Sequence, residues 1–332
     1  MMQSFMRRTV LGALSAVALA GPALADKVTM NLGYAAPEKS VYGVFADLFN
    51  KHLTELTNGE IEIKIRCCGQ ISSEDTAFKA MQLGTVDAYV ITTNNISPHW
   101  PLMDVTVLPY IFQSPEHMLA VAAGPVGEKM QTMMQEATSL HLVAFGGPQY
   151  RDFYNSKRAI NTMADMEGLK IRVPKNEVML ATFEAFGAEP VPLAWSETPT
   201  ALQTGTVDGG DNGTTFIRDM KFYEFEEHLV ILEHFMSMAP LIVSDVFMRK
   251  LSEEQRAAMY EAGRRASKEH TEIVLKELEE VRTWLVEEGG MKMTRPDKAE
   301  FIAAAQGVQE EFAQDRDDEF RALLAEIRAA AE

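Results

Sequence analysis

The chain has few of the residues and motifs that build metal centres or catalytic sites. Its 332 residues include only two cysteines, Cys67 and Cys68, which are adjacent in the sequence. Two cysteines cannot form a zinc site alone, and no C-x-x-C motif is present. The motifs G-x-S-x-G, H-E-x-x-H, G-K-[ST] and G-x-G-x-x-G are also absent. We therefore expect a protein that uses no metal or cofactor and is not an enzyme, although a hydrolase with unrecognised carboxylates stays open as an alternative.

Positive charge is scarce as well. The sequence has 31 Lys and Arg residues against 48 Asp and Glu residues, which gives a formal net charge of −17. Nucleic acids and anionic membrane surfaces would repel such an acidic chain. Neither is expected as a partner.

No apolar run is long enough to span a membrane, and the longest one lies near the N-terminus. Residues 10–21 are apolar or small, follow Arg7 and Arg8, and precede the small-x-small sequence Ala23-Leu24-Ala25. This order is typical of a cleaved export signal and is too short for a transmembrane helix. The sequence predicts a signal peptide over residues 1–25 and a periplasmic mature chain without direct membrane insertion. The paired arginines leave the choice between general secretory and twin-arginine export open.

The adjacent cysteines allow two redox states. A disulfide between neighbours closes a strained eight-membered ring, so two buried thiols are the favoured interpretation. The redox state itself stays open.

Apolar alternation and helix signals predict an α/β fold in the N-terminal part. Residues 28–33 and 61–65 have the pattern of strands, and a helix is expected from Ser40 to about Thr57, where Asn58-Gly59 ends it. A second helix over about 73–83 and a strand over 86–91 complete a β-α-β-α-β order, which favours a mostly parallel sheet covered by helices. Ligands bind beyond the carboxyl ends of such strands. We expect three loops to converge there: 34–39, 69–74 and 92–95.

A repeated segment indicates two similar lobes. Residues 81–88 read M-Q-L-G-T-V-D-A, and residues 202–209 read L-Q-T-G-T-V-D-G. Each predicts a helix, a glycine cap, a tight turn and a strand. We predict lobe I over 26–149, with part of 238–277 returning to it, and lobe II over 150–237. Residues 278–332 are expected to pack on lobe II or to bridge both lobes, and a capping box at Ser252 and Gln255 predicts a long helix up to Glu288.

The segment 168–174 predicts a strand that ends in a functional arginine. Leu169, Ile171 and Val173 alternate with Lys170 and Arg172, and proline follows directly. An arginine on a rigid element can bind a carboxylate through two parallel hydrogen bonds. A solvated surface arginine is the alternative.

Several motifs together resemble a known family. They are N-S-K-R at 155–158, G-L-K-I-R-V-P at 168–174, F-G-A at 186–188 with P-V-P at 190–192, and A-L-Q-T-G with V-D-G at 201–209. This set resembles the substrate-binding proteins of tripartite ATP-independent periplasmic (TRAP) transporters, over essentially the whole mature chain. The resemblance implies a periplasmic binding protein-like fold, with two α/β lobes around a ligand cleft and long C-terminal helices. It also implies capture of a small organic acid and its delivery to the membrane subunits of a TRAP permease.

The resemblance also implies roles for individual residues. Arg172 matches the arginine that pairs with the substrate carboxylate, Arg151 a second arginine of the cleft, and Asn212 an asparagine that hydrogen-bonds the carboxylate. Trp195 and Phe216 match aromatic positions of the pocket, with ordinary core packing as the alternative for both.

From lobe I, Tyr34, Glu74 and Asn94 are expected to close over the ligand. The alternatives are a helix-start charge at Glu74 and turn chemistry at Asn94. A sensor component that reports ligand binding to a membrane signalling partner would need the same cleft, so it stays a second functional hypothesis. The identity of the carboxylate and the oligomeric state stay open.

Overall fold

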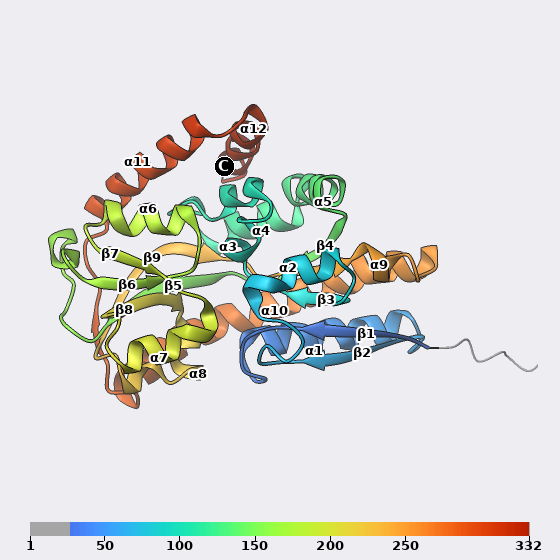
Figure 1. Ribbon diagram of the computed structural model, residues 1–332, viewed down its shortest axis with the longest axis horizontal. Helices are drawn as coiled ribbons and strands as arrows, with labels where there is room; N and C mark the ends of the chain where they lie inside the picture. The colour runs from blue at the N-terminus through green and yellow to red at the C-terminus, as the bar shows by residue number, and fades with distance from the viewer. Residues whose placement is uncertain (1–26, 332) are drawn as a thin grey trace, which may run out of the picture.

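The computed structural model describes residues 27–331, so the predicted signal peptide lies outside the described residues. Two α/β lobes lie side by side, and the C-terminal helices run along both of them (Figure 1). Within residues 27–331, no helix combines the length and the apolar character needed to cross a membrane. The mixed α/β architecture with two sheets agrees with the predicted fold class.

The first lobe is built on a five-stranded sheet in the order β2-β1-β3-β10-β4. Its strands are β1 (Val28–Gly33), β2 (Ile61–Arg66), β3 (Ala88–Val90), β4 (Leu140–Phe145) and β10 (Pro240–Ser244). β1 pairs in parallel with β2 and β3, whereas β10 lies antiparallel between β3 and β4. The sheet is therefore mixed rather than mostly parallel, because a strand from far along the chain returns to it. Its helices are α1 (Val41–Leu56), α2 (Glu74–Gln82), α3 (Thr93–Ile96), η1 (Pro101–Thr106), α4 (Pro115–Ala123), α5 (Pro125–Thr138) and α9 (Asp245–Met248).

The second lobe is built on a six-stranded mixed sheet in the order β11-β9-β5-β8-β6-β7. Its strands are β5 (Gln149–Asn155), β6 (Lys170–Val173), β7 (Glu189–Pro192), β8 (Gly209–Gly213), β9 (His228–Ser237) and β11 (Lys292–Thr294). Its helices are η2 (Met163–Met166), α6 (Glu177–Ala185), η3 (Trp195–Glu197), α7 (Thr198–Gln203), α8 (Thr214–Asp219) and η4 (Phe222–Glu224). The central strand β8 lies antiparallel to β5 and parallel to β6, so the ends of three strands meet at one edge.

The repeated segment has the same geometry in both lobes. Gly84 ends α2 with φ +72°, and Gly205 ends α7 with φ +68°. In each copy the residue after the glycine donates a hydrogen bond back to the helix. The N–H of Thr85 donates to the carbonyl of Ala80 (3.0 Å), and the N–H of Thr206 donates to the carbonyl of Ala201 (2.9 Å). Only glycine adopts this left-handed conformation at low cost. The predicted unit of helix, glycine cap and strand is confirmed.

The long helix predicted from the capping box is α10 (Glu253–Glu287), with Ser252 and Gln255 forming the box. It packs against α1 and β4 of the first lobe and against α8 of the second. The rest of the C-terminus forms two helices, α11 (Ala299–Asp315) and α12 (Asp318–Ala329), with a break between them. Asp317 causes the break by accepting a hydrogen bond from the N–H of Phe320 (2.9 Å) as the cap of a new helix.

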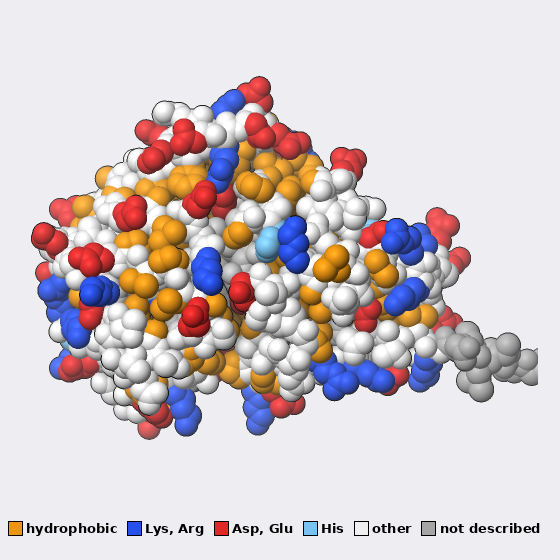
Figure 2. Space-filling view, in the orientation of Figure 1, with side chains coloured by type: hydrophobic (Ala, Val, Ile, Leu, Met, Phe, Trp, Pro, Cys, Tyr) orange, Lys and Arg blue, Asp and Glu red, His pale blue; other side chains and the backbone are white. Residues whose placement is uncertain are grey.

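The C-terminal helices also connect the lobes. α11 packs on α6 of the second lobe, and α12 packs on η1 and α5 of the first. Acidic side chains gather on these helices, at the top of the face shown in Figure 2. The predicted lobe boundaries stay a proposal, to which the sheet membership of β10 and β11 gives support.

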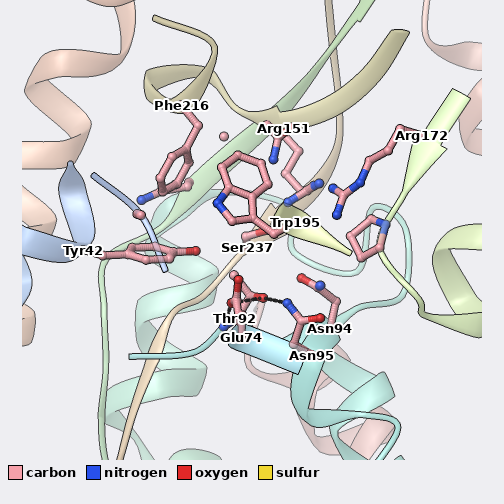
Figure 3. Close-up of a pocket in the computed structure, with 15 residues that line it drawn as sticks. Tyr42, Glu74, Thr92, Asn94, Asn95, Arg151, Arg172, Trp195, Phe216 and Ser237 are labelled. Atoms are coloured by element: carbon pink, nitrogen blue, oxygen red, sulfur yellow. Dashed lines mark hydrogen bonds between the residues drawn. The ribbon is translucent and has the colours of Figure 1, made fainter. Parts of the chain in front are cut away.

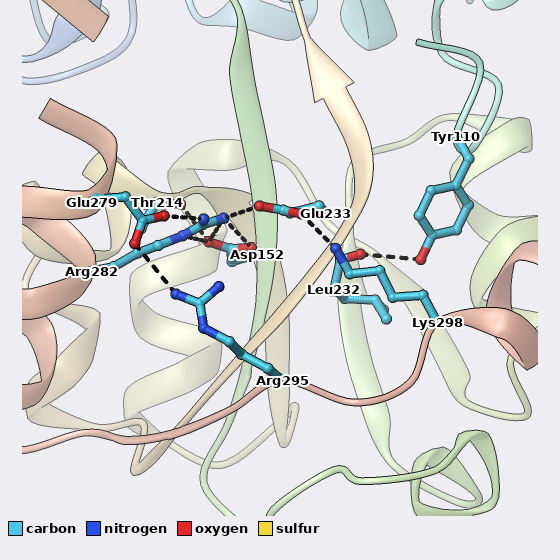
Figure 4. A network of polar contacts seen from close by, with 9 residues as sticks. All are labelled: Tyr110, Asp152, Thr214, Leu232, Glu233, Glu279, Arg282, Arg295 and Lys298. Carbon is cyan, nitrogen blue, oxygen red and sulfur yellow. Dashed lines mark hydrogen bonds and ion pairs between the residues drawn. The ribbon is translucent and has the colours of Figure 1, made fainter. Parts of the chain in front are cut away.

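A buried polar cluster fixes α10 to the second lobe (Figure 4). Arg282 of α10 donates from Nε and Nη2 to the two carboxylate oxygens of Asp152 on β5 (3.0 and 3.1 Å), and from Nη2 to Glu233 on β9 (2.8 Å). The hydroxyl of Thr214 donates to the same Asp152 carboxylate (2.6 Å). Because Thr214 directly follows β8, this cluster connects the C-terminal end of that strand to α10 through Asp152.

The adjacent cysteines do not form two buried thiols. Cys67 and Cys68 are paired as a disulfide at the end of β2, where Cys68 is exposed and has φ +62°. The following turn is tied to the 34–39 loop, since the N–H groups of Cys68 and Gly69 donate to the carbonyls of Ala36 and Tyr34 (both 3.1 Å). The favoured interpretation from the sequence is wrong because the chain turns outward here instead of entering the core.

Candidate functional site

A pocket lies between the two lobes at the strand ends (Figure 3), with about 460 Å³ of empty space that includes solvent at its open side. The first lobe contributes Ala36, Tyr42, Glu74, Thr92, Asn94 and Asn95 to its lining. The second lobe contributes Gln149, Arg151, Arg172, Pro174, Trp195, Asn212, Gly213 and Phe216, and Ser237 comes from the end of β9.

Of the eight side chains predicted from the sequence, the structure brings seven into this pocket: Glu74, Asn94, Arg151, Arg172, Trp195, Asn212 and Phe216. Tyr34 is the exception. Its side chain is turned into the core of the first lobe, where it is 1% exposed and its hydroxyl donates to the carbonyl of Glu38 (3.3 Å). The prediction that Tyr34 lines the cleft is wrong, because the strand end directs this side chain under α1. Tyr42 lines the pocket from α1 instead.

Arg172 is a buried cation without a carboxylate partner among the described residues. It lies next to the last residue of β6, is 3% exposed, and donates from Nε and Nη2 to the carbonyl of Leu193 (3.2 and 2.8 Å). No ion pair joins it to an acidic residue in the part of the chain that the structure describes. Burial lowers the pKa of Arg172 to about 10. Burial of an unpaired charge costs free energy, so binding of an anion beside this guanidinium is favoured.

Arg151 lines the same pocket but already has an acidic partner. Its Nε donates to Oδ2 of Asp211 (2.6 Å), and its Nη2 donates to the backbone carbonyl of Asp211 (2.5 Å). His234 lies 3.2 Å from the same carboxylate oxygen. Burial by itself would raise the pKa of Asp211, but Arg151 and His234 hold that pKa well below its usual range. Asp211 therefore neutralises Arg151, so the two arginines of the pocket differ in whether a carboxylate of the protein compensates their charge.

Asn212 presents an oriented amide. Its Oδ1 accepts a hydrogen bond from the hydroxyl of Tyr154 (2.8 Å), which leaves the NH₂ group as the donor available to the pocket. Burial raises the pKa of Tyr154 well above its usual value, so this hydroxyl keeps its proton. Gly210 makes room for the contact, because a Cβ at that position would lie 2.9 Å from the Tyr154 hydroxyl oxygen. The asparagine can thus donate to a carboxylate next to Arg172.

Aromatic side chains form one wall of the pocket. The Trp195 ring lies edge-on to Phe216 with centroids 6.0 Å apart, and the Arg172 guanidinium carbon lies 5.8 Å from the Trp195 ring centre. Phe216 in turn lies edge-on to Tyr42 at 5.0 Å. The pocket position predicted for Trp195 and Phe216 agrees with this placement. Tyr42 was missed by sequence reasoning, although its place in the first turn of the helix after the 34–39 loop could have indicated it.

The first lobe supplies a polar wall. Oε1 of Glu74 accepts from the N–H and the hydroxyl of Thr92 (both 2.7 Å), and Asn95 donates to that hydroxyl oxygen (2.8 Å). No hydrogen bond to Oε2 of Glu74 occurs among residues 27–331. Glu74 is thus a helix-start residue and a pocket carboxylate at once. Thr92 and Asn95 lie in the 92–95 loop that was expected at this crevice, whereas sequence reasoning missed Gln149 and Ser237.

Comparison with known proteins places this two-lobed cleft in a family. The model of the DctP family, described as bacterial extracellular solute-binding protein, family 7, matches residues 32–315. The chain belongs to this family. A solute-binding protein of Roseobacter denitrificans is 33% identical to it over 306 residues, which cover 92% of this chain and 93% of that relative. The predicted family is confirmed.

Solved structures of relatives have the same fold. A TRAP periplasmic solute-binding protein of Roseobacter denitrificans with bound L-galactonate matches with a TM-score of 0.83 and 31% identity, covering 91% of this chain and 99% of the other. One from Polaromonas sp. JS666 bound to D-erythronate matches with a TM-score of 0.86 and 29% identity, with the same coverage. This DctP-family chain therefore has the two-lobed fold of TRAP periplasmic solute-binding proteins, as predicted.

Proposed function

We propose that this DctP-family protein is a periplasmic receptor that binds one small organic acid through its carboxylate and delivers it to a TRAP permease. The observation that carries the proposal is Arg172, a buried guanidinium with no acidic partner among the described residues, in a pocket lined by both lobes. A desolvated bidentate pair between arginine and carboxylate is among the strongest polar contacts a protein makes. The Asn212 amide would donate to the same carboxylate.

The charges of the pocket favour a hydroxylated monocarboxylate. Asp211 neutralises Arg151, so Arg172 is the pocket cation that lacks a counter-charge. Glu74 on the opposite wall would repel a second carboxylate, whereas its Oε2 can accept a hydrogen bond from a hydroxyl group. The relatives with bound L-galactonate and D-erythronate support this choice, since both ligands are monocarboxylates rich in hydroxyl groups.

Binding would proceed by closure of the lobes. The carboxylate docks on Arg172 and Asn212 of the second lobe, and Glu74 and Asn94 then approach from the first lobe and exclude water. Exclusion of water strengthens the ion pair, because the local dielectric falls. A micromolar dissociation constant corresponds to about −8 kcal/mol. We expect a buried charge pair and packing on Trp195 to reach that affinity.

The proposal is tested by calorimetry on the mature chain, residues 26–332, after denaturing extraction of carried-over ligand. The panel contains D-erythronate, L-galactonate, unhydroxylated monocarboxylates, dicarboxylates and neutral polyols. We expect binding to be confined to carboxylates and Arg172→Ala to weaken it by about 2–5 kcal/mol. Arg172→Lys should also bind poorly, because an ammonium group cannot reproduce the planar fork. The bound acid should be recovered unchanged, as expected for a receptor that is not an enzyme.

The matched control is Arg249→Ala. Arg249 forms an exposed ion pair with Asp245 on the first lobe, and its removal should leave affinity unchanged. Wild-type affinity in Arg172→Ala protein with a native circular dichroism spectrum would overturn the assignment of the carboxylate site.

A further inference from the structure

Tyr42 differs from the other buried tyrosines in its hydrogen bonding. Tyr34, Tyr89 and Tyr154 each donate from the hydroxyl to a protein oxygen: the Glu38 carbonyl, the Ser72 carbonyl and Oδ1 of Asn212. Tyr42 is 5% exposed and lines the pocket, yet its hydroxyl makes no hydrogen bond within the described part of the chain. Most buried tyrosine hydroxyls bond to the protein, so one that faces a pocket without a protein partner is free to bond water or a ligand.

The Tyr42 hydroxyl is directed into the space between the two walls. Figure 3 shows it pointing from α1 toward the centre of the pocket, between the Trp195 ring above and Glu74 with Thr92 below. Burial raises the pKa of this hydroxyl well above its usual value, and Glu74 adds to that effect. The group therefore keeps its proton and is available as a donor and an acceptor in the cavity.

The Tyr42 ring makes an aromatic contact between the lobes. α1 packs in the core of the first lobe through Phe45 and Phe49, whereas Phe216 lies on α8 directly behind Asn212 in the second lobe. The Tyr42 and Phe216 rings meet edge to face at 5.0 Å and 73°. The contacts then continue from Phe216 to Trp195 and from Trp195 to Arg172. Tyr42 thus closes the end of an aromatic wall whose other end carries the carboxylate-binding cation.

We propose that Tyr42 is a specificity-determining residue, which hydrogen-bonds a hydroxyl group of the ligand remote from its carboxylate. This inference rests on the proposed function, since it takes the carboxylate to be held at Arg172. The Tyr42 hydroxyl selects acids that carry an oxygen at that position. The Tyr42 ring, packed on Phe216, covers the carbon chain of any bound acid when the lobes close.

The test separates the hydroxyl from the ring by using D-erythronate and the three dihydroxybutanoates that each lack one of its hydroxyl groups. Tyr42→Phe should weaken D-erythronate binding by about 3- to 10-fold, the effect of one lost neutral hydrogen bond. Tyr42→Phe should leave the affinity unchanged for the one dihydroxybutanoate that lacks the recognised hydroxyl. Tyr42→Ala should weaken all four acids, because it also removes the ring.

Tyr223→Phe is the matched control. Tyr223 packs edge-on against Trp284, away from the pocket, and its loss of a hydroxyl should leave all affinities unchanged. Equal weakening of all four acids by Tyr42→Phe, no effect on D-erythronate, or wild-type protein that does not accept D-erythronate would each overturn the inference. The proposed function fails separately, if no acid of the wider panel binds in an Arg172-dependent way.

Discussion

Replacement of Asp211 by asparagine tests how the pocket assigns its charges. The Arg151 and Asp211 side chains are 6% and 0% exposed, and Asp211 also faces His234. Asp211→Asn keeps the size of the side chain but leaves the Arg151 cation buried without a counter-charge. Breaking a buried pair in this way costs about 3–5 kcal/mol. At about 2–4 °C per kcal/mol for a large domain, the melting temperature should fall on the order of 10 °C.

The same substitution should change ligand choice. Without Asp211, Arg151 becomes a second pocket cation beside Arg172, so dicarboxylates such as tartrate should gain affinity relative to monocarboxylates. We expect the ratio of the two dissociation constants, measured by calorimetry below the lowered melting temperature, to shift toward the dicarboxylate by about tenfold or more.

A double-mutant cycle distinguishes this explanation from a general loss of packing. Arg151→Gln combined with Asp211→Asn removes both charges, so the double variant should regain part of the stability that either single variant loses. The reasoning is refuted if Asp211→Asn stays within about 1 kcal/mol of the wild type in a denaturant titration, or if the two losses simply add.

Three further outcomes are expected. Trp195→Ala should change which acids bind most tightly, while binding of every acid still depends on Arg172. An unchanged order of affinities by calorimetry would assign Trp195 to the core. Burial raises the pKa of Glu226 from 4.5 to about 8, and neither carboxylate oxygen has a hydrogen-bond partner among residues 27–331. The contribution of Glu226 to stability is therefore present below about pH 4.5 and lost as the pH rises through about 8. The melting temperature of Glu226→Gln should accordingly rise relative to that of the wild type between about pH 5 and pH 9. A constant difference between the two melting temperatures over this pH range would contradict the prediction. Protein purified without reductant should show no free thiol in a denaturing Ellman assay, and two free thiols would show that Cys67 and Cys68 are not paired.

Local signals in the sequence were sufficient for many elements of the fold. The strand predicted over 28–33 is β1 itself, and the helix predicted after Ser40 ends at Leu56 as expected. Alternation of apolar residues and helix caps act over a few residues, so they can be read from the chain. The position of β10 between β3 and β4 could not be read in this way, because strand pairing across about 100 residues (to β4) and about 150 residues (to β3) depends on tertiary packing.

The site was predictable where motifs carried it and not where its residues are ordinary in type. Arg172, Asn212 and Trp195 belong to motifs, whereas Thr92 and Asn95 are indistinguishable from turn residues until Glu74 is seen to accept from the former. Tyr34 and Tyr42 are eight residues apart around one loop, and only packing under α1 decides which of the two faces the cavity.

The two arginines show most clearly what the sequence leaves undetermined. Arg151 and Arg172 both lie beside the pocket, and nothing in their motifs indicates which of them has an acidic partner. The antiparallel pairing of β5 with β8 places Phe153 opposite Asp211, so the Asp211 carboxylate can reach the Arg151 guanidinium two residues along the strand. Arg172 lies on the other side of β8, where its one partner within residues 27–331 is the neutral carbonyl of Leu193. The register of one strand pair thus gives Arg151 an internal counter-charge and leaves Arg172 without one. This difference is the physical basis for expecting a single carboxylate in the ligand.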